Sequence, residues 1–227
     1  MRPLTARERR GLAARSARCP RAAWLARPLV EDQTIVFDHL HARLKHATAA
    51  DHARLDAAVT GCGYFASRAR YIAYLQRFCA FQSAAERLLT RHHAQLVLDD
   101  WPQRCRAALA QDDLQALGFN PMTECTRHAS ALLVSAQPEH LLGTAYVLEG
   151  ATLGGAVVLK ALAPLGITAE HGGRFLASYG PARGAMWQRF LDTLAAWEAR
   201  GIAAEETVRA ARAAFSAAAA YLTPASD

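Results

Sequence analysis

The chain has 227 residues, of which 52% are hydrophobic and 20% charged, and its formal net charge at pH 7 is +6. This length and composition exclude a disordered chain and fit one domain with a substantial hydrophobic core. Residues 1–30 contain eight Arg and one acid, Glu8, so this segment carries a formal charge of +7 and the rest of the chain carries −1. Because the positive charge is confined to this segment, we expect the folded part to have no nucleic-acid partner.

The cysteines are odd in number and widely spaced, and they form no CxxC pair: Cys19, Cys62, Cys79, Cys105 and Cys125. This pattern predicts reduced, mostly buried thiols in a reducing compartment and argues against a disulfide framework or a zinc site. No secretory signal is evident, because Arg interrupts every apolar run near the start. The most apolar stretch, 141–167, is broken by Glu149 and Lys160 and falls short of the roughly 20 uninterrupted residues that span a bilayer. We therefore expect a cytoplasmic protein without a membrane partner.

We expect residues 1–33 to be a disordered, Arg-rich extension and residues 34–223 to form one all-α domain. Ala is abundant, Pro and Gly are scarce within long stretches, and alternating strand patterns are hard to find. The predicted helices cover residues 35–59, 67–89, a continuation over 91–98, a segment from Trp101-Pro102 to just before Asp112-Asp113, 122–136, 139–163, 184–200 and 203–222.

The first predicted helix carries a histidine at the border of its apolar face. His52 follows Lys45 by seven residues, which places both on one side of a helix, about 10 Å apart along the axis. This arrangement suits a flat tetrapyrrole, because a neutral imidazole can coordinate the central iron and an ammonium can meet a propionate. The alternative is a boundary histidine beside a solvated lysine, and the two residues alone favour that alternative.

The helix predicted over 139–163 contains four glycines, at positions 143, 150, 154 and 155. Each costs roughly 1 kcal/mol relative to Ala within a helix, so some feature should require them. Either another helix packs unusually close or a ligand lies directly on the backbone. Spacing alone does not separate these explanations. A phosphate-binding loop is excluded, because no strand precedes the segment and Glu149 would repel phosphate.

Together these two segments resemble the haem oxygenase family. Residues 44–55 look like its proximal helix, LKxATxxxHxxL, and residues 146–155 are similar to the bacterial distal-helix pattern YVLEGSxLGG, with Ala151 in the Ser place. Weaker likenesses occur over 109–118 and 175–187, so the resemblance spans roughly residues 40–190. The branch associated with bacterial phytochromes looks nearest, and the resemblance implies a single-domain multi-helix bundle.

The resemblance implies that His52 is the proximal ligand to haem iron. It also assigns residues to the rest of the pocket: Lys45, Tyr146 and Arg189 to the propionates, and Gly150, Gly154 and Gly155 to the distal side, where Gly150 and Gly154 face the bound oxygen. Ala151 departs from the pattern, which puts the rate or regioselectivity of the reaction in doubt.

The implied activity is the oxidative opening of haem to biliverdin, CO and Fe²⁺, with O₂ and electrons from a ferredoxin or a reductase. A bacteriophytochrome is a candidate partner for the product. Two other classes stay open: a haem carrier or sensor on the same fold, and a thiaminase-like helical enzyme that needs a nucleophilic Cys. The remaining histidines form no HExxH and no paired ExxH motifs, so a zinc or di-iron site is not expected.

Overall fold

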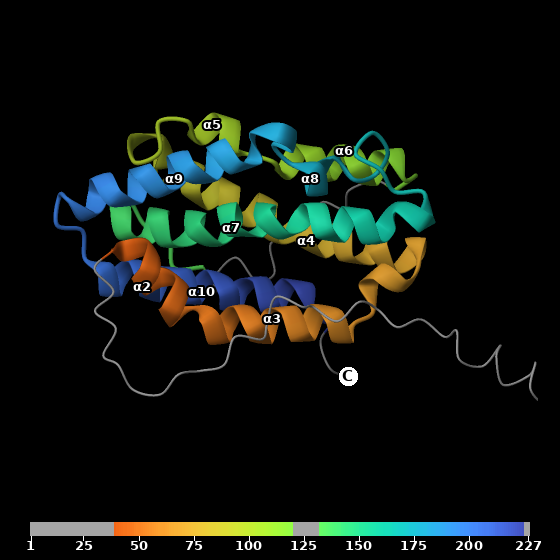
Figure 1. Ribbon diagram of the computed structural model, residues 1–227, viewed down its shortest axis with the longest axis horizontal. Coiled ribbons are helices and arrows are strands. Elements are labelled where there is room, and N and C mark those ends of the chain that lie inside the picture. Colours follow the sequence, from red (N-terminus) through yellow and green to blue (C-terminus); the bar gives the residue numbers. More distant parts are fainter. Residues whose placement is uncertain (1–38, 120–131, 225–227) are drawn as a thin grey trace, which may run out of the picture. The chain divides into compact units, whose positions relative to one another are not determined.

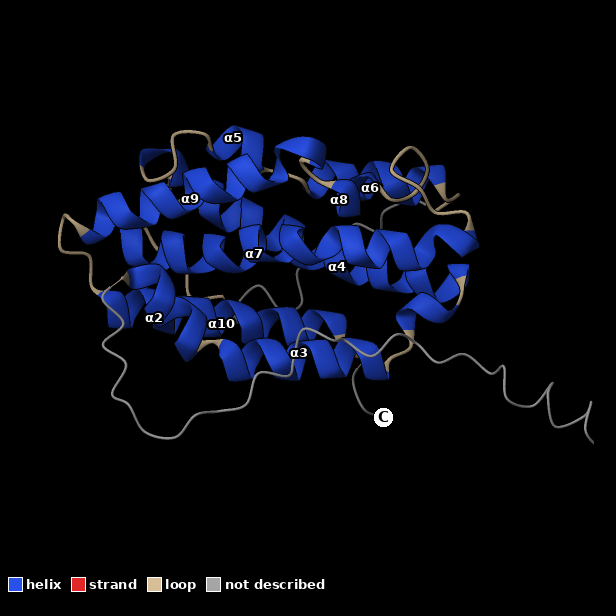
Figure 2. Ribbon diagram, viewed as in Figure 1, coloured by secondary structure: helices blue, strands red, loops and turns tan. Residues whose placement is uncertain are grey.

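The structure, a computed structural model, describes residues 39–119 and 132–224, and its regular elements are helices (Figures 1 and 2). The α-helices are α2 (Leu40–Ala47), α3 (Ala49–Gly61), α4 (Arg68–Arg91), α5 (Trp101–Arg104), α6 (Ala107–Ala116), α7 (Pro138–Leu162), α8 (Arg174–Ala177), α9 (Arg183–Glu198) and α10 (Ala204–Leu222). Short 3₁₀ turns are η1 (Tyr64–Ala66), η2 (Ala94–Leu96), η4 (Ala163–Leu165) and η5 (Gly180–Ala182). The described residues contain no strand, so the all-α prediction is confirmed; the predicted extension lies outside them.

The first predicted helix is divided in two at Thr48. This residue has φ −99° and ψ 0°, and its hydroxyl donates to the Leu44 carbonyl oxygen at 2.8 Å. Such a bond from a Thr side chain to the preceding turn bends helices. The break therefore changes the direction of the chain between Lys45 on α2 and His52 on α3. The predicted start of this helix at residue 35 lies outside the described residues.

The segment after Trp101 also differs from the prediction. A helix ending before Asp112-Asp113 is wrong, because α5 stops at Arg104 and a new helix, α6, runs across both acids. Asp113 is buried, and its carboxylate accepts backbone N–H groups at the start of α8, from Arg174 at 3.0 Å and Phe175 at 2.8 Å. The acid is therefore a helix cap and not a helix end. The helix predicted over 122–136 lies mostly outside the described residues, and 132–136 are not helical.

The core is organised around α10 and α7, which pack along each other, while α10 also contacts α2, α3 and α4 (Figure 1). The buried face of α10 is lined with small side chains: Ala210, Ala211, Ala214, Ala217 and Ala218. A Cβ added to Gly143 of α7 would lie only 2.3 Å from the Thr207 carbonyl oxygen of α10. Small residues thus let the two backbones approach closely.

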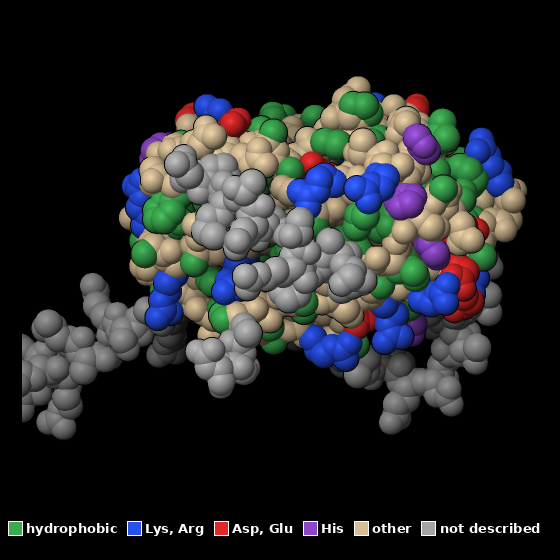
Figure 3. Space-filling view, turned by 180° about the vertical axis from the view of Figure 1, so that it is seen from behind, with side chains coloured by type: hydrophobic (Ala, Val, Ile, Leu, Met, Phe, Trp, Pro, Cys, Tyr) green, Lys and Arg blue, Asp and Glu red, His purple; other side chains and the backbone are tan. Residues whose placement is uncertain are grey.

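One helical segment of the described chain, Pro138–Leu165, is long and apolar enough to cross a membrane, but 56% of its most apolar window is buried inside the fold. This burial is typical of the core helix of a soluble protein. On the face shown in Figure 3, the visible Lys and Arg side chains lie in small groups among apolar, acidic and uncharged surface. The visible described part of that face therefore shows no continuous basic stripe.

Candidate functional site

Tyr146 connects α7 to the junction between α2 and α3. Its ring centroid lies 6.3 Å from that of His41 on α2. Burial raises the pKa of the phenol, and a hydrogen bond with the Thr48 side chain lowers it by less. From this contact α3 and α7 run in the same direction (Figure 1), so His52 lies one turn beyond Thr48 and Gly150 one turn beyond Tyr146. The two sequence segments that carry the predicted site therefore start from a shared contact.

The His52 imidazole is half exposed, and its Nδ1 lies 3.0 Å from the Asp56 carboxylate one turn further along α3. Its ring also meets the edge of Phe215 on α10, at 5.7 Å between centroids. A carboxylate on Nδ1 fixes the tautomer and orientation of an imidazole and makes its Nε2 a stronger metal ligand. The geometry of His52 thus fits the role that the sequence predicts for it.

The hydrogen bond with Asp56, together with the charge of that carboxylate, raises the pKa of His52 above 6.5, while burial opposes the shift. We expect the ring protons of His52 in the ligand-free protein to titrate above pH 6.5 in an NMR titration. Asp56→Asn should move this midpoint down. Because protonation strengthens the pair, its contribution to stability is present at low pH and is lost as pH rises through the raised pKa. Equal midpoints in the two proteins would contradict the pairing.

The four glycines of α7 divide into two pairs. A Cβ on Gly155 would lie 2.3 Å from the Leu176 carbonyl oxygen, so close packing against α8 requires this glycine, as packing against α10 requires the one at 143. A Cβ on Gly150 or Gly154 would meet nothing within 4 Å. Beside them, Leu153 is 43% and Val157 is 73% exposed. We call Gly150, Leu153, Gly154 and Val157 the open strip; an exposed apolar face on a core helix is typical of a ligand site.

Glu149 lies on the buried side of α7, opposite a group of basic and phenolic side chains. Its carboxylate accepts hydrogen bonds from Arg104 at 2.7 Å and from Tyr179 at 2.9 Å, and it lies 3.5 Å from Arg106. Burial raises the pKa of this carboxyl, and the two Arg charges oppose the shift. Arg106 also donates to the Leu148 carbonyl oxygen at 2.9 Å. The network therefore anchors the backbone of α7 at the turn where the open strip begins.

The structure does not bring every predicted residue to the open strip. Arg189 is paired at 3.4 Å with the buried Asp100, which directly precedes α5, and it follows Trp187, which contacts α2, by two residues. It therefore points to a different side of α9 from the one that faces α2. Gly155 is buried against α8, as described above. Lys45 is exposed on α2, in the same helix as His41.

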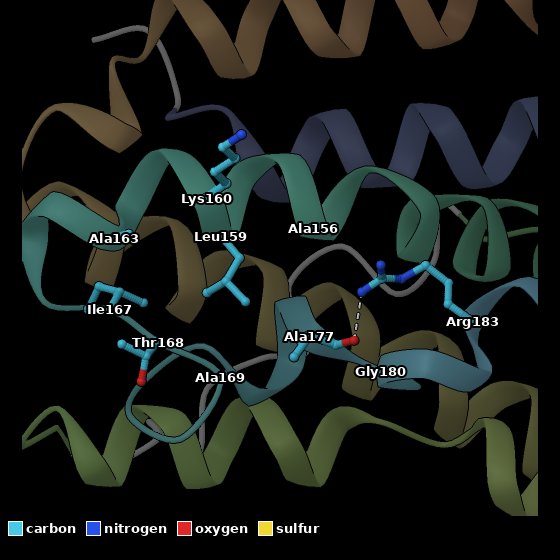
Figure 4. Close-up of a pocket in the computed structure, with 10 residues that line it drawn as sticks. All are labelled: Ala156, Leu159, Lys160, Ala163, Ile167, Thr168, Ala169, Ala177, Gly180 and Arg183. Carbon is cyan, nitrogen blue, oxygen red and sulfur yellow. Dashed lines mark hydrogen bonds between the residues drawn. The ribbon is translucent and has the colours of Figure 1, made fainter.

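A cavity of about 430 Å³ lies beside the C-terminal half of α7, under the loop that contains Thr168 (Figure 4). Its lining is mostly apolar and includes neither His52 nor a residue of the open strip. At its edge Arg183 donates to the Ala177 carbonyl oxygen at 2.7 Å, while Lys160 points away from the cavity (Figure 4). This cavity is separate from the arrangement around His52.

The cysteines of the described residues give little support to nucleophilic catalysis. Cys79 is buried and Cys62 half-buried, whereas Cys105 is exposed, contrary to the expectation of buried thiols. Burial of its sulfur nevertheless raises the pKa of Cys105 to about 11, so the thiolate is scarce at neutral pH. Within 39–119 and 132–224, no group of three or more His, Cys, Asp or Glu is placed to hold a metal ion. Cys19 and Cys125 lie outside these ranges.

The fold is a helical bundle in which one helix carries a carboxylate-paired histidine and another carries an open glycine strip. These features are those expected of a helical protein that binds a flat ligand between two helices. The sequence profile of the Heme oxygenase family matches residues 38–222, so the chain belongs to that family and, with it, binds haem as substrate.

Among its relatives, Heme oxygenase PigA of Pseudomonas aeruginosa is 30% identical over 155 residues, which are 67% of this chain and 75% of PigA. The crystal structure of the NO- and CO-bound heme oxygenase of Neisseria meningitidis superposes with a TM-score of 0.72 at 26% identity, over 83% of this chain and 95% of that one. Heme oxygenase from Leptospira interrogans, at 17% identity, shares the fold with a TM-score of 0.64, over 81% of this chain and 98% of its own.

Proposed function

We propose that this chain binds haem between α3 and α7 and opens the ring with O₂ to give biliverdin, CO and Fe²⁺. His52 is the iron ligand, and Gly150 and Gly154 line the side on which oxygen binds. The observation that carries the proposal is the position of these two glycines. They have open space over them, and they lie one and two turns beyond the contact that joins α7 to the His52 helix.

The residues of the chain supply binding and orientation. A neutral imidazole on iron lacks the strong electron donation of a thiolate, which favours O–O cleavage at the metal. Asp56 holds His52 in one orientation. The glycines leave room for a small ligand next to the porphyrin, and the Glu149 network keeps that part of α7 in place. We place the propionates beyond the Gly150 end of the strip, near Tyr146, and assign Lys45 of α2 to them as a cation.

The opening of the haem ring consumes electrons as well as O₂. We therefore propose a ferredoxin or a reductase as the external donor. A cytoplasmic location gives access to both. We further propose that the protein belongs to the bacteriophytochrome-associated branch, with the photoreceptor as the partner that takes up biliverdin.

The test is a single turnover of the hemin-loaded protein with ferredoxin, its reductase and NADPH in air. We expect the Soret band to disappear, biliverdin to appear in the extract, and one CO and one Fe²⁺ to be released per haem. The same mixture without O₂ is the control. Hemin that stays bound and intact would instead indicate a carrier or sensor. Ala151, which stands where the family pattern has Ser, is the residue that keeps this alternative open. A protein that does not bind hemin would contradict the proposal and favour a thiaminase-like enzyme.

A further inference from the structure

The cavity beside the C-terminal half of α7 has the size and lining of a small-molecule site. Its volume of about 430 Å³ lies within the range of roughly 300–1,000 Å³ that is typical of such sites. The lining is mostly apolar. In Figure 4 the side chains of Leu159 and Ile167 lie toward one end of the cavity, and the guanidinium of Arg183 lies toward the other, beside Ala177.

Arg183 presents an unpaired positive charge at its end of the cavity. Its Nη2 donates to the carbonyl oxygens of Leu176 at 3.4 Å and Ala177 at 2.7 Å, which hold the guanidinium in place. Within the described residues, Nη1 makes no hydrogen bond, Nε is buried without a partner, and no acid forms an ion pair with this arginine. Glu170, in the loop beside the cavity, is exposed. A fixed guanidinium with unused donors is suited to bind a carboxylate.

The backbone that positions this arginine is strained. Ser178 has φ 51° and ψ −123°, a conformation that residues with a Cβ rarely adopt. Its hydroxyl is buried, and it has no hydrogen-bond partner in the part of the chain that the structure describes. Strain of this kind collects at ligand sites, and here it lies between two lining residues, Ala177 and Gly180. Packing of α8 alone does not account for a strained turn with an unsatisfied hydroxyl.

We propose that this cavity is a second ligand site, which takes a small apolar molecule that ends in a single carboxylate. The apolar lining covers the hydrocarbon part, and Nη1 of Arg183 donates to the carboxylate. Of the two basic lining residues, Lys160 points away from the cavity (Figure 4), so one positive charge matches one negative charge. The lining includes neither His52 nor a residue of the open strip, so this site does not depend on the proposed function.

The experiment compares octanoate with octanamide, which has the same shape and no charge. The chain has four isoleucines, so NMR signals of isoleucine methyl groups are easily assigned. The protein is saturated with gallium protoporphyrin, a diamagnetic substitute for hemin, to fill the haem site. Octanoate should shift the Ile167 signal and leave that of Ile202 unchanged. Ile202 precedes Ala203, which bonds to Glu139 at the opposite end of α7. Octanamide should bind about tenfold more weakly.

Two matched substitutions test the role of the charge. Arg183→Met should raise the Kd of octanoate about tenfold, to the value for octanamide, and leave the Kd of octanamide unchanged. The unchanged octanamide value shows that the cavity is intact. Lys160→Met removes a neighbouring charge that does not face the cavity, and it should keep the preference for octanoate. Ala163→Phe fills the cavity from an exposed position and should abolish the Ile167 shift with both compounds.

Three results would overturn the proposal: an Ile167 signal that octanoate does not move, equal affinities for octanoate and octanamide in the unmodified protein, or a preference for octanoate that survives Arg183→Met. The Ile167 signal can also be followed without porphyrin. A failure of porphyrin binding would therefore contradict the proposed function and leave this test of the second site in force.

Discussion

Gly154→Leu will abolish tight hemin binding while leaving the fold intact. The added side chain enters the space over the open strip, because nothing lies within 4 Å of the position of its Cβ. We expect the hemin Kd to rise at least about 100-fold, or roughly 2.7 kcal/mol. The thermal unfolding midpoint should stay the same or increase, since Leu is the better helix former by several tenths of a kcal/mol. Hemin titration and a thermal melt measure the two effects.

Gly155→Ala is the matched substitution on the packed side of the same helix. Its Cβ would lie 2.3 Å from a backbone oxygen of α8, so a shift of α7 or α8 is required. Overpacking of this kind typically costs about 1–3 kcal/mol. We expect a lower melting temperature here, in contrast to Gly154→Leu. Normal hemin affinity in Gly154→Leu would show that the porphyrin does not lie on the open strip.

The second large effect is on stability. Glu149→Ala should lower the free energy of unfolding by about 3 kcal/mol, because it takes the shared carboxylate from Arg106 and from the fully buried Arg104, which keeps Asp100 as its other partner. Urea unfolding followed by circular dichroism measures this loss. Glu170→Ala, at an exposed loop position, is the control and should stay within about 0.5 kcal/mol of the unmodified protein. A loss below 1 kcal/mol for Glu149→Ala would mean that the network does not anchor α7.

Much of the helical pattern could be predicted from the sequence, because α9 and α10 each bury one face over several turns and α4 and α7 are long runs rich in apolar residues. The predicted boundaries of these helices lie within about two residues of those observed. The wrong boundaries come from side-chain hydrogen bonds, which apolar periodicity does not reveal. Thr48 breaks a helix through a bond from its own side chain, and Asp113 stays helical because its partner is the backbone of α8, some 60 residues away.

Fewer features of the candidate site than of the fold could be predicted from the sequence. The resemblance identified His52 and the glycine helix, but spacing could not say which glycines serve packing and which face open space. That division depends on where α8 and α10 cross α7. A carboxylate inside an apolar helix, such as Glu149, indicates that partners exist. Their identity could not be predicted, because Arg104 lies 45 residues away in the chain. The family resemblance assigned Arg189 to the propionates, whereas in the structure its side chain is paired with Asp100.

The most direct measurement is the absorption and electron paramagnetic resonance spectrum of the protein titrated with hemin, compared with that of His52→Ala. We predict saturation at one hemin per chain with the signature of histidine-ligated ferric iron. His52→Ala should lose that signature, and added imidazole should restore it. An unchanged spectrum in His52→Ala would mean that another group holds the iron, and the site described between α3 and α7 would be wrong.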